Sequence, residues 1–154
     1  DRVVSYANWG NNLKVNLGSA DETAPPFTLG SGREEVLRAM GTPQVISVAG
    51  DKQTWYYGNS TVYFDSRGKV TSWNNYGNLK VSMGKWSEPP STFTVGSSME
   101  DVIKAMGTPD SIYTNNFSVY ATCWRYGWST VYFDKNGKVL YWDNMGGNLR
   151  VVEP

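Results

Sequence analysis

Residues 60–70 read STVYFDSRGKV, and residues 129–139 read STVYFDKNGKV, which differs in only two letters. The β-branched and aromatic residues at the start of this stretch favour a strand. Asp65 and the glycine at position 68 are typical of a hairpin turn, in which glycine takes the positive φ angle. Val70 then opens the next strand, so the chain is predicted to build the same β-hairpin twice.

The repetition extends well beyond this hairpin. Recurring segments are 27–31 at 93–97, 39–43 at 105–109, and 12–15 at both 78–81 and 148–151. Equivalent residues are 66 positions apart up to Pro109 and 69 positions apart between Trp124 and Val139, which predicts a three-residue insertion between Pro109 and Trp124. Because residues 12–15 match the end of each copy, the chain begins inside the last strand of a third, partial copy.

These matches give the domain organisation that we expect. Residues 1–18 form the partial repeat, 19–26 and 85–92 are linkers, and 27–84 and 93–154 are two repeat units. Two explanations of the partial repeat remain open: its strand caps a sheet, or the chain is a fragment of a longer array. We favour the array, because stacked repeats need several units for stability.

Each unit opens with the signals of a short helix. Ser31 and Glu34 have the spacing of a capping box, and Ser97 and Glu100 repeat it. Glycine at positions 41 and 107 suits a C-terminal cap, and the proline two residues later cannot continue the helix. A helix of about ten residues is too short to be stable alone in water, so it must lie on a sheet. The predicted fold class is therefore α+β, a tandem repeat of a short helix packed on a 3–4-stranded antiparallel sheet.

Alternation along residues 60–65 assigns the two faces of this strand. Val62 and Phe64 point to one side, and Thr61 and Tyr63 point to the other. We expect the helix to cover Val62 and Phe64. The side that bears Thr61 and Tyr63 is then open to solvent or to a partner.

The strand at residues 69–74 cannot be oriented in this way. Strict alternation puts Val70 and Trp73 on opposite faces, although both are apolar. A bulge is one way to bring the two side chains to the same face.

Composition excludes several classes of function. Lys+Arg and Asp+Glu both number 14, so the chain lacks the basic excess that nucleic-acid binding requires. There is no His to act as a base or metal ligand, and the single Cys123 cannot form an internal disulfide. Turns, caps and linkers explain the carboxylates, so we expect no enzyme activity, no cofactor and no metal. No apolar run is long enough for membrane insertion.

Within residues 27–74 and 93–144, the order of the motifs resembles a known family. Ser-x-x-Glu-x-Val, Met-Gly-Thr-Pro, Trp-x-Tyr-Gly, Val-x-Phe-Asp and Gly-Lys-Val follow one another. This order is similar to the outer-membrane lipoprotein SmpA/OmlA family and to the repeat unit of the β-lactamase inhibitory protein family. The resemblance implies a non-catalytic, secreted or periplasmic protein that binds other proteins, in the inhibitory family through an aromatic-rich concave sheet.

Comparing the two copies separates packing residues from candidate contacts. Aromatic residues that persist in both copies, such as Trp55 and Trp124, are explained by a shared need for packing. Other positions change: Tyr56 becomes Arg125, Asn59 becomes Trp128, and Ser72 becomes Tyr141. Exposed Trp, Tyr and Arg are enriched in binding hot spots. The candidate binding residues are Tyr63, Trp73, Arg125, Trp128, Tyr132, Tyr141 and Trp142.

The function that we expect is a non-catalytic protein-binding module of an exported bacterial repeat protein, secreted or at the cell surface. Its partner would bind to the aromatic face of the sheet. One alternative is a carbohydrate or cell-wall binding module, because flat Trp and Tyr rings stack on sugars and Asn side chains bond hydroxyls. The other is a structural spacer in a repeat array. The expected partner is another protein or a glycan, with no nucleic acid and no membrane insertion, and the oligomeric state stays open.

Overall fold

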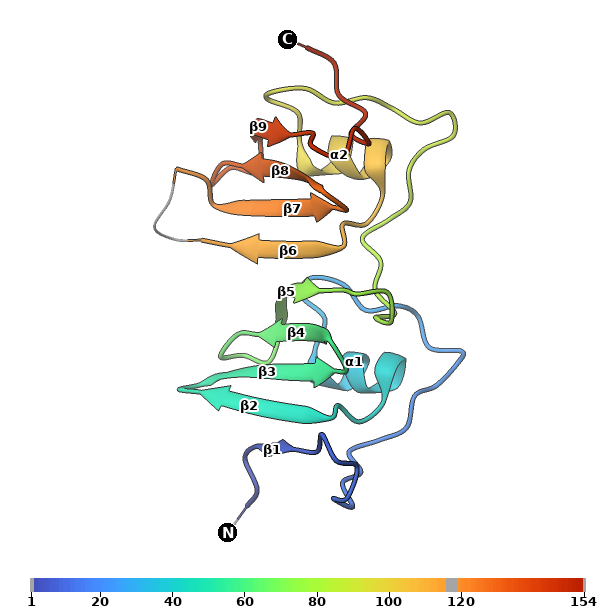
Figure 1. Ribbon diagram of the computed structural model, residues 1–154, viewed down its shortest axis with the longest axis vertical. Coiled ribbons are helices and arrows are strands. Elements are labelled where there is room, and N and C mark those ends of the chain that lie inside the picture. The colour runs from blue at the N-terminus through green and yellow to red at the C-terminus, as the bar shows by residue number, and fades with distance from the viewer. Residues whose placement is uncertain (1, 116–118, 154) are drawn as a thin grey trace. The chain divides into compact units, whose positions relative to one another are not determined.

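The computed structural model describes residues 2–115 and 119–153, and the chain divides into two compact units, Asp1–Ser82 and Met83–Pro154 (Figure 1). The first unit contains β1 (Tyr6–Ala7), α1 (Arg33–Met40), β2 (Val45–Ala49), β3 (Lys52–Tyr57), β4 (Ser60–Phe64) and β5 (Val70–Asn74). The second unit contains α2 (Met99–Met106), β6 (Ser111–Thr114), β7 (Thr122–Tyr126), β8 (Ser129–Phe133) and β9 (Val139–Asp143). Neighbouring strands within each unit are antiparallel.

The predicted fold class is wrong. We expected a short helix packed on a 3–4-stranded antiparallel sheet, repeated in tandem, whereas the protein is mostly antiparallel sheet, and the strands of each unit pair in chain order. The two helices contribute only eight residues each. The first unit alone exceeds the prediction, because β1 pairs with β2 through Tyr6 and Ile46 and brings that unit to five strands. An edge strand carries unpaired N–H and C=O groups, and the partial N-terminal repeat pairs with β2 at Val45 and Ile46.

A β-bulge settles the face of the strand that the sequence left open. Between its pairs with Tyr63 and Phe64 of β4, strand β5 carries one extra residue, Thr71. The extra residue shifts the alternation by one position. Val70 and Trp73 therefore lie on the same face, where their exposed fractions are 2% and 0%. Strand β9 has the same irregularity opposite β8 in the second unit.

Both helices begin one residue later than the predicted capping boxes imply. The N-cap of α1 is Gly32, whose N–H donates to Glu35 Oε1 at 3.1 Å. The N-cap of α2 is Ser98, whose Oγ accepts from the N–H three residues later at 3.1 Å. The predicted cap, Ser31, instead accepts from the N–H of Thr28 at 2.9 Å, and its equivalent in the second unit does the same. The Ser31 hydroxyl, predicted to cap the helix, thus accepts a hydrogen bond within the preceding turn instead.

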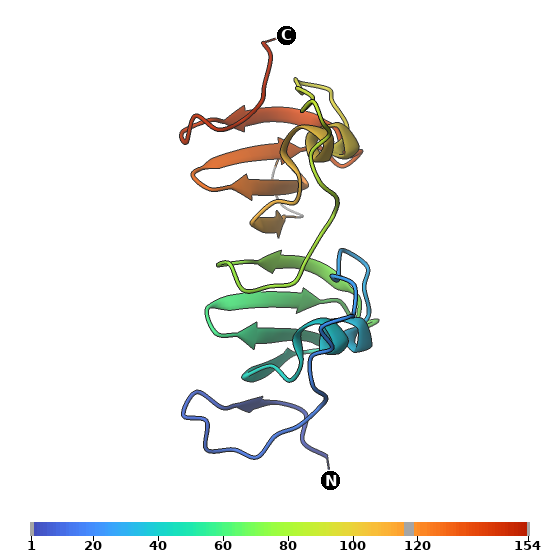
Figure 2. The ribbon, with the colours of Figure 1, turned by 90° about the vertical axis from the view of Figure 1, so that its right-hand side faces the viewer.

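The apolar face of β4 is covered as predicted. Val62 and Phe64 are exposed by only 0% and 2%, and Figure 2 shows α1 and α2 each beside one face of the strands of its own unit. On the other face, Tyr63 is 40% exposed, as expected for an open side. Thr61, also predicted to be open, is buried, because its short side chain lies directly opposite the larger Tyr56.

The three-residue insertion in the second copy lies in the loop between β6 and β7. Thr114 pairs with Thr122, at the place where Val48 pairs with Gln53 in the first unit. The loop of the second unit is therefore longer by three residues. Its central residues, 116–118, lie outside the described part of the chain.

A buried tyrosine ties the end of each helix to the sheet. The Tyr57 hydroxyl donates to the carbonyl of Gly41, and the Tyr126 hydroxyl donates to the carbonyl of Gly107, both at 2.8 Å. These carbonyls lie just after α1 and α2, where helix backbone lacks partners of its own. Burial is the main reason that the pKa of both hydroxyls lies far above its usual value of 10.0.

Tyr126→Phe should make the protein less stable at neutral pH and less sensitive to alkali. The lost hydrogen bond leaves the Gly107 carbonyl unpaired, at a cost of about 1–3 kcal/mol. In the wild type, an unfolded tyrosine ionises above pH 10 while the folded one keeps its proton. The free energy of unfolding therefore falls by about 1.4 kcal/mol per pH unit for each buried tyrosine. Urea unfolding at neutral pH and at several alkaline pH values measures both effects, and an unchanged alkaline slope in the variant would contradict the role of Tyr126.

Candidate functional site

Four side chains form a row across the open face of the second unit. Tyr113 of β6 lies opposite Cys123 of β7, which lies opposite Tyr132 of β8, which in turn lies opposite Tyr141 of β9. Directly opposed residues on antiparallel strands project from the same face, with Cβ atoms about 5 Å apart. Tyr113 and Tyr141 are 59% and 42% exposed, so the row is accessible to solvent.

Ring contacts hold this row in place. Tyr132 and Tyr141 stack with ring centroids 4.3 Å apart and planes inclined by 16°. Tyr120, from the loop before β7, meets Tyr132 edge-on at 4.9 Å. Aromatic pairs of this kind are worth about 0.5–1.5 kcal/mol beyond the area that they bury. We call Tyr113, Tyr120, Tyr132 and Tyr141 the tyrosine face.

A charged row lies beside the tyrosine face. Arg125 of β7 and Asp143 of β9 are both exposed, and both lie opposite Thr130 of β8. Burial raises the pKa of Tyr132, and the neighbouring Cys123 and the other groups around it raise it further. Tyr132 therefore keeps its proton at physiological pH, and one basic and one acidic side chain lie along the side of the tyrosine face.

The structure brings some of the predicted contact residues together and separates others. Those on the open face of the second unit are Arg125, Tyr132 and Tyr141. Trp128 lies in the tight turn between β7 and β8 and is 83% exposed. Tyr63 belongs to the first unit, on the open side of β4.

Trp73 and Trp142, which were predicted as contacts, belong to the core side instead. Trp73 is fully buried and meets Phe27 edge-on at 6.3 Å. Trp142 lies opposite the buried Val131 and meets Phe93 edge-on at 6.1 Å. The bulge explains the correction, because it shifts the alternation in β5 and β9 and turns both indoles away from the open face.

The first unit has no tyrosine face. The residues of its corresponding row are Ser47, Thr54, Tyr63 and Ser72. Its core, by contrast, closely matches that of the second unit: Trp55 packs on Phe64 at 4.7 Å, and Trp124 packs on Phe133 at 4.6 Å. The first unit is thus built without the stacked pair, because Ser72 lies opposite Tyr63. Its tyrosines are arranged differently: burial raises the pKa of Tyr63, and nearby Tyr56 and Tyr76 raise it further.

Two members of the tyrosine face, Tyr113 and Tyr120, were not among the predicted contact residues. Tyr113 stands where the first unit has Ser47, so the comparison of copies that singled out Tyr141 could also have found it. Tyr120 lies in the loop that carries the insertion, where the first unit offers no counterpart.

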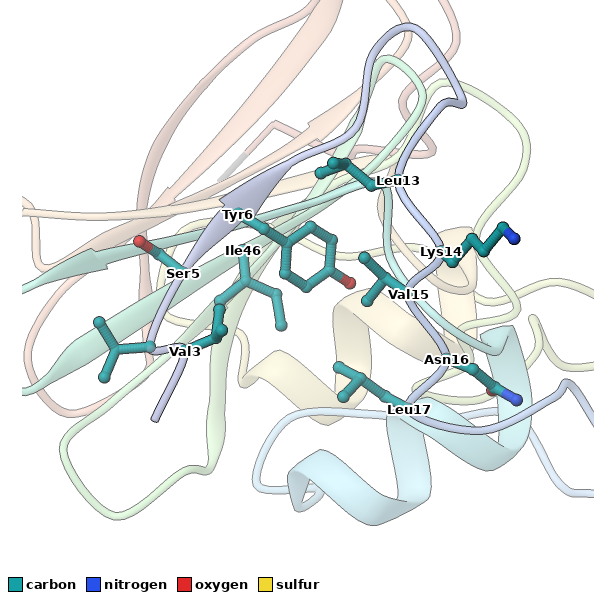
Figure 3. Close-up of a pocket in the computed structure, with 10 residues that line it drawn as sticks. Val3, Ser5, Tyr6, Leu13, Lys14, Val15, Asn16, Leu17 and Ile46 are labelled. Atoms are coloured by element: carbon teal, nitrogen blue, oxygen red, sulfur yellow. The ribbon is translucent and has the colours of Figure 1, made fainter. Parts of the chain in front are cut away.

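The first unit also carries an apolar groove, which was not predicted from the sequence. A cavity of about 460 Å³ opens between the N-terminal segment and β2 (Figure 3). Its apolar lining includes Val3, Tyr6, Leu13, Val15, Leu17 and Ile46. The signal lay in the partial repeat, because a copy that supplies only its last strand and closing segment lacks the helix that covers them in a complete copy.

Two kinds of site are absent from the described residues. Within residues 2–115 and 119–153, no three His, Cys, Asp or Glu side chains gather as a metal ion would require. Across that same part of the chain, neither helix has the length and apolarity needed to cross a membrane.

Cys123 should report chemically on the tyrosine face. Burial raises the pKa of its thiol, although Arg125 acts in the opposite direction. Because the thiolate is the reactive form, iodoacetamide should alkylate Cys123 several-fold more slowly in the folded protein than in urea. Tyr132→Ala should speed the folded reaction by uncovering the thiol, whereas Tyr63→Ala in the first unit should not. Equal rates in the wild type and Tyr132→Ala would show that this ring does not cover the thiol.

No protein-family model matches the sequence, and no curated protein or solved structure is significantly similar to it. The resemblance to the SmpA/OmlA and β-lactamase inhibitory protein families stays a prediction.

Proposed function

We propose that this chain is a non-catalytic binding module and that the tyrosine face of its second unit contacts another protein. The observation that carries the proposal is the stacked pair formed by Tyr132 and Tyr141 on an open sheet surface. The first unit has Tyr63 and Ser72 at these positions and keeps the same core. Contact with a partner explains an exposed aromatic cluster that the fold itself does not require.

The chemistry of the tyrosine face suits a protein partner. Tyr and Arg are enriched at the centre of protein interfaces, and here a tyrosine cluster lies beside Arg125. A tyrosine presents a flat apolar ring with a hydroxyl at its tip, and it has few torsions to fix on binding. The stacking of Tyr132 on Tyr141 restricts these rings already in the free protein, so a partner meets a preorganised surface.

A glycan is the second candidate, and one observation favours it. Trp128 is 83% exposed in the turn between β7 and β8, and its indole offers a flat apolar surface on which a sugar ring could stack. Trp128 lies outside the row of tyrosines. The two candidates therefore depend on different residues.

We place the module outside the cell, secreted or at the cell surface. The composition supports this placement, because only 18% of the residues are charged and the polar surface relies on Asn, Ser, Thr, Gly and Tyr. Extracellular proteins of the producing organism are therefore the first place to seek the partner.

Photo-crosslinking from the tyrosine face tests the proposal. The chain carries p-benzoylphenylalanine in place of Tyr141 and is exposed to those extracellular proteins. We expect one saturable adduct that excess wild-type chain removes. Tyr141→Ser installs the residue that the first unit has at this position. As an unlabelled competitor, this variant should be weaker than the wild type by about tenfold or more, as expected for a hot spot.

The matched control is Tyr63→Ala. Tyr63 is the equivalent of Tyr132 in the first unit, where the tyrosine is not stacked on a second one. This variant should compete as well as the wild type. Equal competition by wild type and Tyr141→Ser would place the contact elsewhere and overturn the proposal. Binding on a glycan array that is lost in Trp128→Asn and kept in Tyr141→Ser would favour the carbohydrate candidate instead.

A further inference from the structure

The N-terminal segment folds like the closing segment of a complete unit. In three places a leucine N–H donates to an asparagine Oδ1 at 3.0 Å: Leu13 to Asn8, Leu79 to Asn75, and Leu149 to Asn144. The strand that precedes this turn in the N-terminal segment is β1, which pairs antiparallel with β2. Residues 2–17 thus supply the last part of a repeat without its helix.

In a complete unit, a phenylalanine seals the closing segment. The Phe27 N–H donates to the carbonyl of Lys80 at 3.1 Å, and the Phe27 carbonyl accepts from the N–H of Ser82 at 3.0 Å. The ring of Phe27 meets Trp73 on the core side. Phe93 makes the same two hydrogen bonds in the second unit, at 3.0 and 2.9 Å, and meets its own tryptophan.

Without such a phenylalanine, the apolar surface of the N-terminal segment stays open. Val3 stands where the first unit has Val70, and Leu13 stands where it has Leu79. Val70 and Leu79 are 2% and 7% exposed, whereas Val3 and Leu13 are 83% and 44% exposed. Removing apolar surface from water is the main driving force of association. The difference therefore marks an apolar surface that is covered in the complete units and exposed here.

These side chains line the groove beside β2. Figure 3 shows Tyr6, Val15, Leu17 and Ile46 around one hollow, with Val3 at one side of it. The volume of about 460 Å³ lies within the range of ligand-binding pockets. Most of the residues that line it are apolar.

The repeat suggests how an extended segment would bind to the backbone of the groove. Lys14 and Asn16 are equivalent in the repeat to Lys80 and Ser82. The backbone of Lys80 and Ser82 forms the two hydrogen bonds with the N–H and carbonyl of Phe27. A phenylalanine segment laid in the groove can form the same pair of hydrogen bonds with Lys14 and Asn16. The Lys80 ammonium also donates to carbonyls that precede the phenylalanine, and Lys14 carries the same group.

We propose that this groove binds a phenylalanine-and-helix segment from a further repeat, in which the phenylalanine precedes an eight-residue amphipathic helix by six residues. Residues 27–40 and 93–106 show this pattern and this mode of binding. Phe27 and Phe93 are each only 1% exposed, so both segments of this chain are already bound within their own units. A second folded copy therefore has no such segment to offer, and the occupant is an unpaired segment of this type.

A synthetic peptide of residues 22–42, titrated into the full chain, tests the proposal by calorimetry. We expect saturable binding, weakened about tenfold or more by Phe27→Ala in the peptide. Leu13→Asp in the protein should abolish the binding, because it places a charge in the groove. Val95→Asp, at a residue 46% exposed in the second unit, should leave the binding unchanged. Thermal melts by circular dichroism show whether both protein variants are folded.

Ordering the helix of the free peptide has an entropic cost that could weaken its binding. A tethered form of the peptide keeps the test decisive in that case. The same peptide is joined ahead of residue 2 through a flexible Gly/Ser linker, which raises its effective concentration to roughly the millimolar range. We expect a higher Tm of the first unit, and Phe27→Ala in the tethered copy should remove the increase. Absence of both binding and stabilisation, or binding that ignores Leu13→Asp, would overturn the proposal. Self-association of the chain alone that Leu13→Asp prevents would overturn it too, by making a second copy the occupant.

Discussion

The backbone pairing of the phenylalanine that opens each unit with the segment that closes it is the constraint on which the rest of the structure depends. Phe27 is hydrogen-bonded on both sides to the segment around Val81, far along the chain, and its ring meets Trp73. The helix and the hairpins lie between these two ends. Joining the ends carries a loop-closure cost, which the burial of Phe27, Val36 and Trp73 offsets together. The helix is therefore held by a long-range contact rather than by its own two turns.

The two sides of the sheet meet different demands, and the two copies show this inside one chain. On the core side both units solve the same packing problem, so Trp55 and Trp124 make nearly the same ring contact. On the open side that demand is relaxed, and Ser72 in one unit corresponds to Tyr141 in the other. A difference confined to the relaxed side changes what the surface can bind without changing how the unit folds.

The sequence predicted local features better than the way in which strands combine. The covered face of Val62 and Phe64 followed from simple alternation, but no pattern located the bulge at Thr71. Because a one-residue shift exchanges the two faces of a strand, that bulge alone moved Trp73 from the predicted contact surface to the core. The fold class failed for a related reason, since strand pairing is long-range and β1 adds to a sheet whose size the repeat period does not reveal.

The partial N-terminal copy separates what the repeat encodes locally from what it needs from elsewhere. The Leu13 N–H bonds Asn8 at the same distance as in the complete units, although the N-terminal segment has no phenylalanine of its own, so this turn forms from nearby residues. The burial of Val3 is different, because it requires a segment distant in the chain or on another molecule. A strand and its turn can therefore be complete while the apolar surface that they carry is unfinished. The groove beside β2 follows from this mismatch, since hydrogen bonding at the sheet edge and burial of its apolar face depend on different segments.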